Sequence, residues 1–241
     1  MPDQLDILLS AQSPTAERPL LGLTVLVVED SRFASEAMRL LCLRSGARIR
    51  RADSLRSARR HLAVYRPSVV IVDLGLPDGP GSELIAELAT ANPRVGVILG
   101  ISGDADRCEE AIAAGADGFL EKPIEGLSVF QARVLEHLPQ HARPKGLRQI
   151  SDDRVEPDPL ALLDDLSHIT EVLTGKEDLD RSSVVYAVQF LCGLARMSHD
   201  SPLEEAANRL SAHLVDGEPI GSDVARIAGL VQQRLTARQV V

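Results

Sequence analysis

The sequence predicts an α/β domain with a parallel sheet, followed by a region built from helices alone. Two observations lead to this prediction. Short apolar runs alternate with helical patterns as far as about residue 138, and only helical patterns follow the proline-rich segment after it. Strands that alternate with helices form parallel sheets with right-handed crossovers. The expected divisions are an N-terminal extension (1–20), an α/β domain (21–140), a linker (141–158) and a helical domain (159–241).

The strands of the α/β domain are predicted from short apolar segments. Continuous apolar runs at 24–28, 69–72 and 95–101 are typical of strands buried on both faces. The segment 47–51 alternates between apolar and charged residues and predicts an edge strand with one solvent-exposed face. The segment 118–121 is predicted to form the last strand. The first 20 residues hold a short apolar stretch at 5–9 that predicts one small helix before Pro14.

Helices are predicted from apolar residues at helical spacing, ended by glycine or proline. Between the strands these patterns fall near 33–41, 55–65, 84–88, 106–114 and 127–138. After the linker they fall near 160–169, 184–194, 203–214 and 224–235. Ser201, followed by Pro202 and Glu204, predicts a capping box for the third of these last helices. Ser222 is the expected cap of the fourth.

Composition and charge limit the function classes. The chain has 241 residues and a net charge of −9, of which residues 151–241 carry −8 (16 acids against 8 Lys and Arg). This acidity predicts no binding to nucleic acid or to anionic membranes. The 3 cysteines are far apart and predict reduced thiols rather than disulfides or a clustered metal site. With no apolar run of about 18 residues and no secretory leader pattern, the expected location is cytoplasmic.

Charged or polar side chains lie at the ends of several predicted strands. Glu29 and Asp30 follow the first strand, Asp73 ends the third, and Ser102 and Lys122 end the last two. The carboxyl ends of parallel strands meet at one edge of the sheet, where α/β proteins bind ligands. Converging carboxylates repel one another and attract Mg²⁺, and a carboxylate can act as a nucleophile and form an acyl phosphate. Phosphoryl transfer then requires positioning and charge neutralisation.

With these residues in place, residues 22–140 resemble a response-regulator receiver domain of two-component signal transduction. The matching motifs are Val27-Val28-Glu29-Asp30, Asp73-Leu74-Gly75-Leu76-Pro77 with Gly81, Ile101-Ser102-Gly103 and Phe119-Leu120-Glu121-Lys122-Pro123. The resemblance implies a flavodoxin-like sheet of five strands in the order 2-1-3-4-5. It also implies a cis peptide between Lys122 and Pro123.

The resemblance further implies a role for each site residue. Asp73 is the expected phosphoacceptor, and Ser102 and Lys122 bind the phosphoryl group. Asp30, Asp73 and the Gly75 carbonyl hold Mg²⁺ directly, with Glu29 acting through water. Phe119 occupies the position of the family's switch residue. Such a domain catalyses its own Mg²⁺-dependent phosphorylation and dephosphorylation without being an enzyme in the usual sense, and its partner is a sensor histidine kinase or a histidine phosphotransfer protein.

The helical region leaves the output open. Its acidity favours a protein-interaction output over DNA binding. Its helices carry more apolar surface than a bundle of about 80 residues easily buries, which predicts a homodimer through them. Two alternatives stay open: a phosphorelay intermediate that passes phosphate between proteins, and a DNA-binding transcriptional regulator with an atypical output domain. His199 with Asp200 faintly resembles the phosphoacceptor box of histidine kinases, but Pro202 follows too early. The simpler interpretation is that His199 closes one helix before the next begins.

Overall fold

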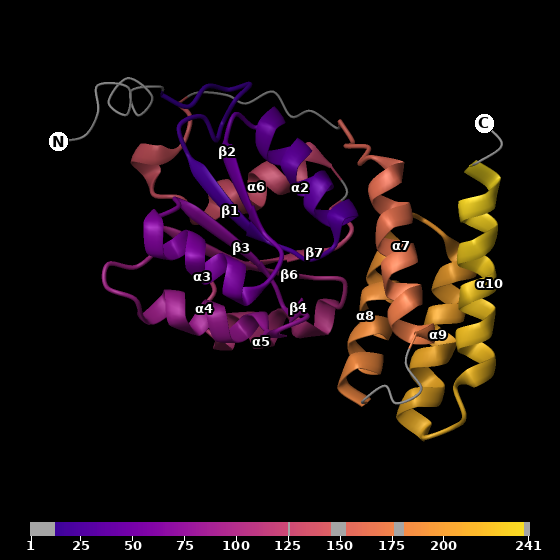
Figure 1. Ribbon diagram of the computed structural model, residues 1–241. Helices are drawn as coiled ribbons and strands as arrows, with labels where there is room; N and C mark the ends of the chain where they lie inside the picture. The colour runs from indigo at the N-terminus through magenta and orange to yellow at the C-terminus, as the bar shows by residue number, and fades with distance from the viewer. Residues whose placement is uncertain (1–12, 125, 146–152, 176–180, 239–241) are drawn as a thin grey trace. The chain divides into compact units, whose positions relative to one another are not determined.

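The structure, a computed structural model, describes residues 13–124, 126–145, 153–175 and 181–238 (Figure 1). The chain separates into two compact units. The first consists of the chain through Asp30 together with Ser35–Glu156, and the second of Ser31–Ala34 together with residues from Pro157 onward. The helix predicted at 5–9 and part of the predicted linker (146–152) lie outside the described residues.

A five-stranded parallel sheet forms the centre of the first unit, which confirms the predicted α/β fold. Its spatial order is β2-β1-β3-β6-β7, the order implied by the resemblance. The strands are β1 (Thr24–Val28), β2 (Arg48–Ala52), β3 (Val69–Asp73), β6 (Val97–Ser102) and β7 (Gly118–Glu121). Every residue of β3 and β6 is buried, whereas β2 lies at the edge and exposes most of its residues.

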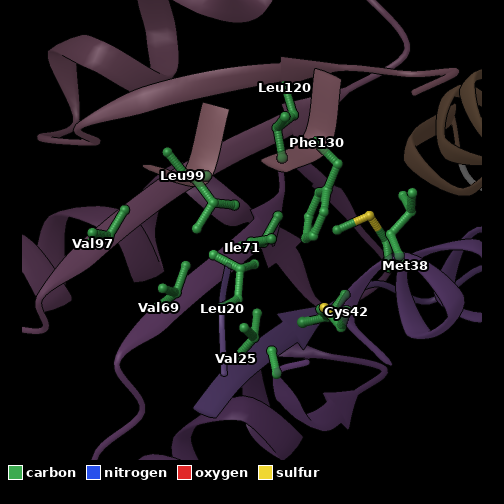
Figure 2. Close-up of a cluster of buried hydrophobic side chains, with 14 of the residues drawn as sticks. Leu20, Val25, Met38, Cys42, Val69, Ile71, Val97, Leu99, Leu120 and Phe130 are labelled. Atoms are coloured by element: carbon green, nitrogen blue, oxygen red, sulfur yellow. The ribbon is translucent and has the colours of Figure 1, made fainter. Parts of the chain in front are cut away.

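Alternate residues of the strands divide the core of this unit into two layers. Val25, Val69, Val97 and their neighbours pack with α2 (Arg32–Arg44) and α6 (Leu127–His137), as Figure 2 shows. The residues between them pack on the opposite face with α3 (Leu55–Val64), α4 (Gly81–Thr90) and α5 (Cys108–Ala113). Because both faces are covered by helices, the inner strands β1 and β3 consist almost entirely of Val, Ile and Leu.

Two local features of this unit differ from the prediction. The loop after β3 contains a two-residue antiparallel pair, β4 (Gly75–Leu76) with β5 (Gly79–Pro80), which is too short to leave a periodic pattern. In the same loop Asp78 accepts hydrogen bonds from the backbone N–H groups of Leu55 and Arg56, at 2.8 and 3.0 Å, so this carboxylate caps the start of α3. The helix expected at 106–114 begins as a 3-10 turn, η1 (Ala105–Arg107).

The second unit contains α7 (Pro159–Thr174), α8 (Arg181–Met197), α9 (Ser201–Asp216) and α10 (Gly221–Arg238). The predicted all-helical region is thus confirmed. Consecutive helices pack on one another and α10 packs back on α7, which closes a four-helix bundle around an apolar core. Within this unit, the buried Asp165 accepts hydrogen bonds from the Ser31 hydroxyl and from the backbone N–H groups of Arg32 and Phe33.

The N-terminal caps of two helices in this unit differ from the predicted ones. Asp200, not Ser201, caps α9, because its carboxylate accepts the Leu203 backbone N–H at 3.1 Å while Ser201 is already helical. Ser222 lies inside the first turn of α10, which starts at Gly221, so it is not the cap. No helix within the described residues is long and apolar enough to cross a membrane.

Candidate functional site

Three carboxylates meet at the carboxyl edge of the sheet. One ligand oxygen each from Glu29, Asp30 and Asp73 lies within 4.8 Å of the others. Glu29 and Asp30 follow β1, and Asp73 ends β3, the strand that pairs beside it. Glu29 and Asp73 are buried, with 3% and 8% of their surface exposed. The sequence prediction that these acids converge is therefore confirmed by the structure.

Lys122 supplies the opposing charge. Its ammonium Nζ lies 2.6 Å from Glu29 Oε2 and 2.7 Å from Asp73 Oδ2. Lys122 follows β7, and its backbone N–H donates to the Ser102 carbonyl at 2.8 Å, which fixes the end of β7 against the end of β6. The peptide bond between Lys122 and Pro123 is cis, as the resemblance implies. One buried cation thus joins two of the three acids.

Burial and charge act in opposite directions on these groups. Burial is the main reason that the pKa of Glu29 is well above its usual value; the charge of Lys122 lowers it, while the charges of Asp73 and Asp30 raise it. Burial alone would lower the pKa of Lys122, but the charges of Asp73 and Glu29 and their hydrogen bonds outweigh it and raise that pKa. The lysine therefore stays charged, and the cluster gains from any further cation.

Loop backbone groups position the side chains around Asp73. The Gly75 N–H donates to Asp73 Oδ1 at 3.1 Å, which holds the carboxylate at the end of its strand. The buried Ser102 hydroxyl accepts the Asp104 N–H at 3.1 Å. Ser102 ends β6, which pairs with β3 and with β7. The strand order therefore brings Ser102 to the same edge as Asp73 and Lys122.

Phe119 lies on β7 directly opposite Gly100 of β6. It is half-buried and packs against the core layer formed with α3, α4 and α5. A Cβ atom at position 100 would come within 2.7 Å of Ala111 and 3.4 Å of the Phe119 ring, so only glycine leaves this space open. The ring of Phe119 thus packs closely beside Gly100.

One residue near the site has no signal in the sequence. Arg107, in η1, donates from its guanidinium to the Leu74 carbonyl at 3.2 Å and forms an ion pair with Glu110 at 2.8 Å. It ties the loop after Asp73 to the start of α5. An arginine among several surface arginines carries no pattern of its own, and its partner carbonyl lies 33 residues away in the chain.

The donor set fits a hard divalent cation. Carboxylate oxygens gathered around one point, in a site that keeps only partial contact with water, are the ligands that Mg²⁺ prefers. Asp30 is the most exposed of the three acids. Lys122 neutralises only part of the negative charge. Glu29, Asp30 and Asp73 can therefore hold Mg²⁺.

His199 lies apart from this chemistry, in the second unit. It is exposed, follows the end of α8 and has a φ of +53°, a left-handed conformation that ends the helix. Its neighbour Asp200 caps α9 and pairs with Arg234 of α10. These bonds occupy the carboxylate that a kinase-like phosphoacceptor box would place beside the histidine.

Comparison with known proteins identifies the first unit. Residues 25–133 match the response regulator receiver domain. The chain is 33% identical over 135 residues to the KDP operon transcriptional regulatory protein KdpE of Escherichia coli K12, covering 55% of this chain and 60% of that protein. It is 31% identical over 144 residues to the DNA-binding transcriptional activator DevR/DosR of Mycobacterium tuberculosis, covering 54% of this chain and 65% of that protein. The matches span about half to two thirds of the relatives' length.

Among solved structures, the chemotaxis response regulator CheY4 of Vibrio cholerae is 22% identical, with a TM-score of 0.41 and coverage of 48% of this chain and 98% of that one.

The names of these relatives correct one prediction. The expectation of an output that does not act on DNA, and of no nucleic acid partner, is wrong, because the relatives are transcriptional regulators and one is named as DNA-binding. The expected homodimer through the C-terminal helices stays a prediction, as do the kinase partner, the phosphorelay alternative and the cytoplasmic location. Residues 25–133 of this chain form a response regulator receiver domain.

Proposed function

We propose that the chain is a response regulator that accepts a phosphoryl group on Asp73 from a phosphohistidine of a sensor kinase or of a phosphotransfer protein. One observation carries the proposal: three acids lie within 4.8 Å of one another at the carboxyl edge of the sheet, and one buried lysine contacts two of them. Asp73 is the acid at the end of the central strand β3, held there by the Gly75 N–H. Asp30, Asp73 and the Gly75 carbonyl would hold Mg²⁺, with Glu29 acting through water.

The transfer is a displacement at phosphorus. An Asp73 carboxylate oxygen attacks the phosphorus atom, a P–O bond forms, and the P–N bond to the donor imidazole breaks. The imidazole leaves with the electron pair, and the product is an acyl phosphate. Mg²⁺ supplies charge neutralisation on the phosphoryl oxygens when bound.

The side chains of this chain position and stabilise the transferred group. Lys122 already contacts the acceptor carboxylate at 2.7 Å and can follow the negative charge to the phosphoryl oxygens. Ser102, at the end of the neighbouring strand, can donate its hydroxyl to the same group. Movement of Ser102 toward the phosphate would let Phe119 repack against the core, which converts a local charge change into a change of surface.

Acetyl phosphate with Mg²⁺ tests the acceptor. The wild type should gain one phosphate per chain, seen as an 80 Da mass increase that hydroxylamine removes, and chelation of Mg²⁺ should prevent it. Asp73→Asn should gain none. Asp53→Asn is the matched control, because Asp53 follows β2 at the same edge of the sheet but is exposed. Equal labelling of the wild type and Asp73→Asn would refute the assignment.

The output that the relatives support is control of transcription through DNA. Phosphorylation of Asp73 would then change the affinity of the whole chain for DNA. The test is selection of duplexes from a random pool by the full-length protein, with and without beryllofluoride as the phosphoryl mimic. Enrichment of a defined sequence that depends on beryllofluoride would support the output. No enrichment in either state, from protein that labels normally on Asp73, would refute it.

A further inference from the structure

The arginines of the first unit gather at one edge of its sheet. Seven of them are exposed and belong to β2, to α3 or to the residues just after α3, and five of the seven form no ion pair with a described residue. We name this group the basic edge; it consists of Arg48, Arg50, Arg56, Arg60 and Arg66. No carboxylate of the described residues lies within ion-pair distance of these five side chains. The neighbouring Arg51 and Arg59, by contrast, pair with Glu36 and Glu87.

The geometry of β2 separates two kinds of arginine. Ile49 packs against the core layer beside α2, and Arg51 on the same face reaches Glu36 of that helix. Arg48 and Arg50 point to the other face, together with Ala52, which packs in the layer beside α3. Alternate residues of a strand face opposite sides, so this division follows from the pleat.

The helix α3 continues the same charged surface. Arg56 and Arg60 lie one turn apart, and both are exposed. Burial raises the pKa of Tyr65, at the end of this helix, and the charge of Arg50 acts in the opposite direction. The strand and the helix, both labelled in Figure 1, thus contribute to one positive surface.

The described residues of the second unit offer no comparable surface. In residues 201–237 each arginine has a carboxylate within 4 Å: Arg209 with Asp223, Arg226 with Glu205, and Arg234 with Asp200. Arg196 of α8 pairs with Glu204. These ion pairs hold the helices together and cancel the positive charge that a nucleic acid would need.

We propose that the basic edge binds the phosphate backbone of duplex DNA. This inference rests on the proposed output and names the surface that serves it. Charge complementarity selects the occupant: guanidinium groups bind phosphate oxygens in a bidentate manner, and no carboxylate in the described part of the chain pairs with these five. Arginines on an edge strand also discourage pairing with another strand. Protection of the edge strand explains Arg48 and Arg50, which lie on β2. It does not explain Arg56, Arg60 or Arg66, which lie on α3 or just after it.

The expected magnitude follows from counterion release. Five phosphate contacts give a slope of about −4.5 in log affinity against log salt, so affinity falls about 500-fold between 50 and 200 mM salt. Removal of three contacts should reduce the slope to about −1.8 and the fall to about 12-fold. The slope separates phosphate contact from a general loss of folding, because partly unfolded protein lowers affinity at every salt concentration alike.

The experiment measures fluorescence anisotropy of a 30-base-pair duplex of mixed sequence against the full-length chain with beryllofluoride, from 50 to 200 mM salt. The test variant is R48A/R50A/R60A. The control variant, R133A/R181A/R226A, removes the same charge from three exposed arginines outside the basic edge. Both variants must accept phosphate from acetyl phosphate as the wild type does, which shows that the receiver is folded.

A reduced slope for the test variant alone would support the proposal. Equal losses in both variants would show an effect of net charge and would overturn it. Wild-type slopes in both variants would overturn the basic edge but leave the DNA output in place. If the wild type fails to bind the duplex even at 50 mM salt, both the surface and the output are wrong; binding of polyglutamate instead would identify an acidic protein as the partner.

Discussion

Replacement of Gly81 by alanine tests how closely the acceptor loop packs. Gly81 begins α4, and a Cβ atom built there would lie 1.9 Å from the Asp73 carbonyl oxygen and 3.0 Å from the Leu74 Cα. Both neighbours are backbone atoms, so no flexible side chain can move aside. Relief of the clash requires a shift of about 1 Å in the residues that carry the acceptor, since protein interiors are close-packed.

Two consequences follow for Gly81→Ala. Overpacking that forces a backbone shift costs about 1–3 kcal/mol of the free energy of unfolding. A displacement of about 1 Å at a reacting group can cost about 100-fold in rate. We therefore expect a lower urea midpoint and about 100-fold slower labelling by acetyl phosphate, with Mg²⁺ present at saturation.

The matched control is Gly229→Ala. Gly229 lies in the middle of α10, is exposed to solvent and has no atom within 4 Å of the added Cβ. Alanine should therefore stabilise that helix by about 1 kcal/mol and leave the rate of labelling unchanged. Wild-type labelling and stability in Gly81→Ala would show that the contact between α4 and the acceptor strand is looser than the structure has it, and would refute the argument.

Three further outcomes are expected. The Cys42 thiol is fully buried, which raises its pKa to about 12, so it should react with a maleimide only after unfolding. Cys108 and Cys192 are less buried and should react earlier, and mass spectrometry of the labelled peptides checks this order. Lys122→Ala leaves two buried carboxylates without their cation and should lower the free energy of unfolding at pH 7 by about 3 kcal/mol in urea titrations. Hydrogen bonds from His213 and Arg209 lower the pKa of Asp223, so Asp223→Asn should reduce the melting temperature at pH 7. The difference in melting temperature between wild type and variant should shrink as the pH falls below about 4, where the wild-type carboxylate becomes protonated. A constant difference from pH 7 to about 3.5 would contradict this expectation.

The sequence predicted the sheet and the acidic cluster for a physical reason. Buried parallel strands require unbroken runs of Val, Ile and Leu, and the residues that end such runs must meet at one edge. The sequence alone therefore predicts that Glu29, Asp30, Asp73 and Lys122 meet at this edge. The cap of α9 was assigned to Ser201 rather than Asp200, because adjacent polar residues look equally suitable until the backbone angles decide between them.

Contacts between distant segments left no trace in the sequence pattern. The Arg107 bond to Leu74 and the Asp78 cap of α3 join residues 33 and 23 positions apart. The prediction that the chain does not bind DNA was wrong for a different reason. Net charge is a sum over the whole chain, whereas DNA meets one surface. In that sum, the acids concentrated after residue 150 outweigh the arginines that cluster around β2 and α3.

The cap that Asp78 places on α3 has a consequence for the order of folding. The first two N–H groups of this 10-residue helix bind a carboxylate that is synthesised later and lies beyond strand β3. So short a helix is marginal by itself. A chain that ends before residue 78 would lack this partner, and we expect α3 to reach its full hydrogen-deuterium exchange protection only when the loop that follows Asp73 has taken its place. The same loop thus completes both the acceptor and the helix that precedes it in the chain.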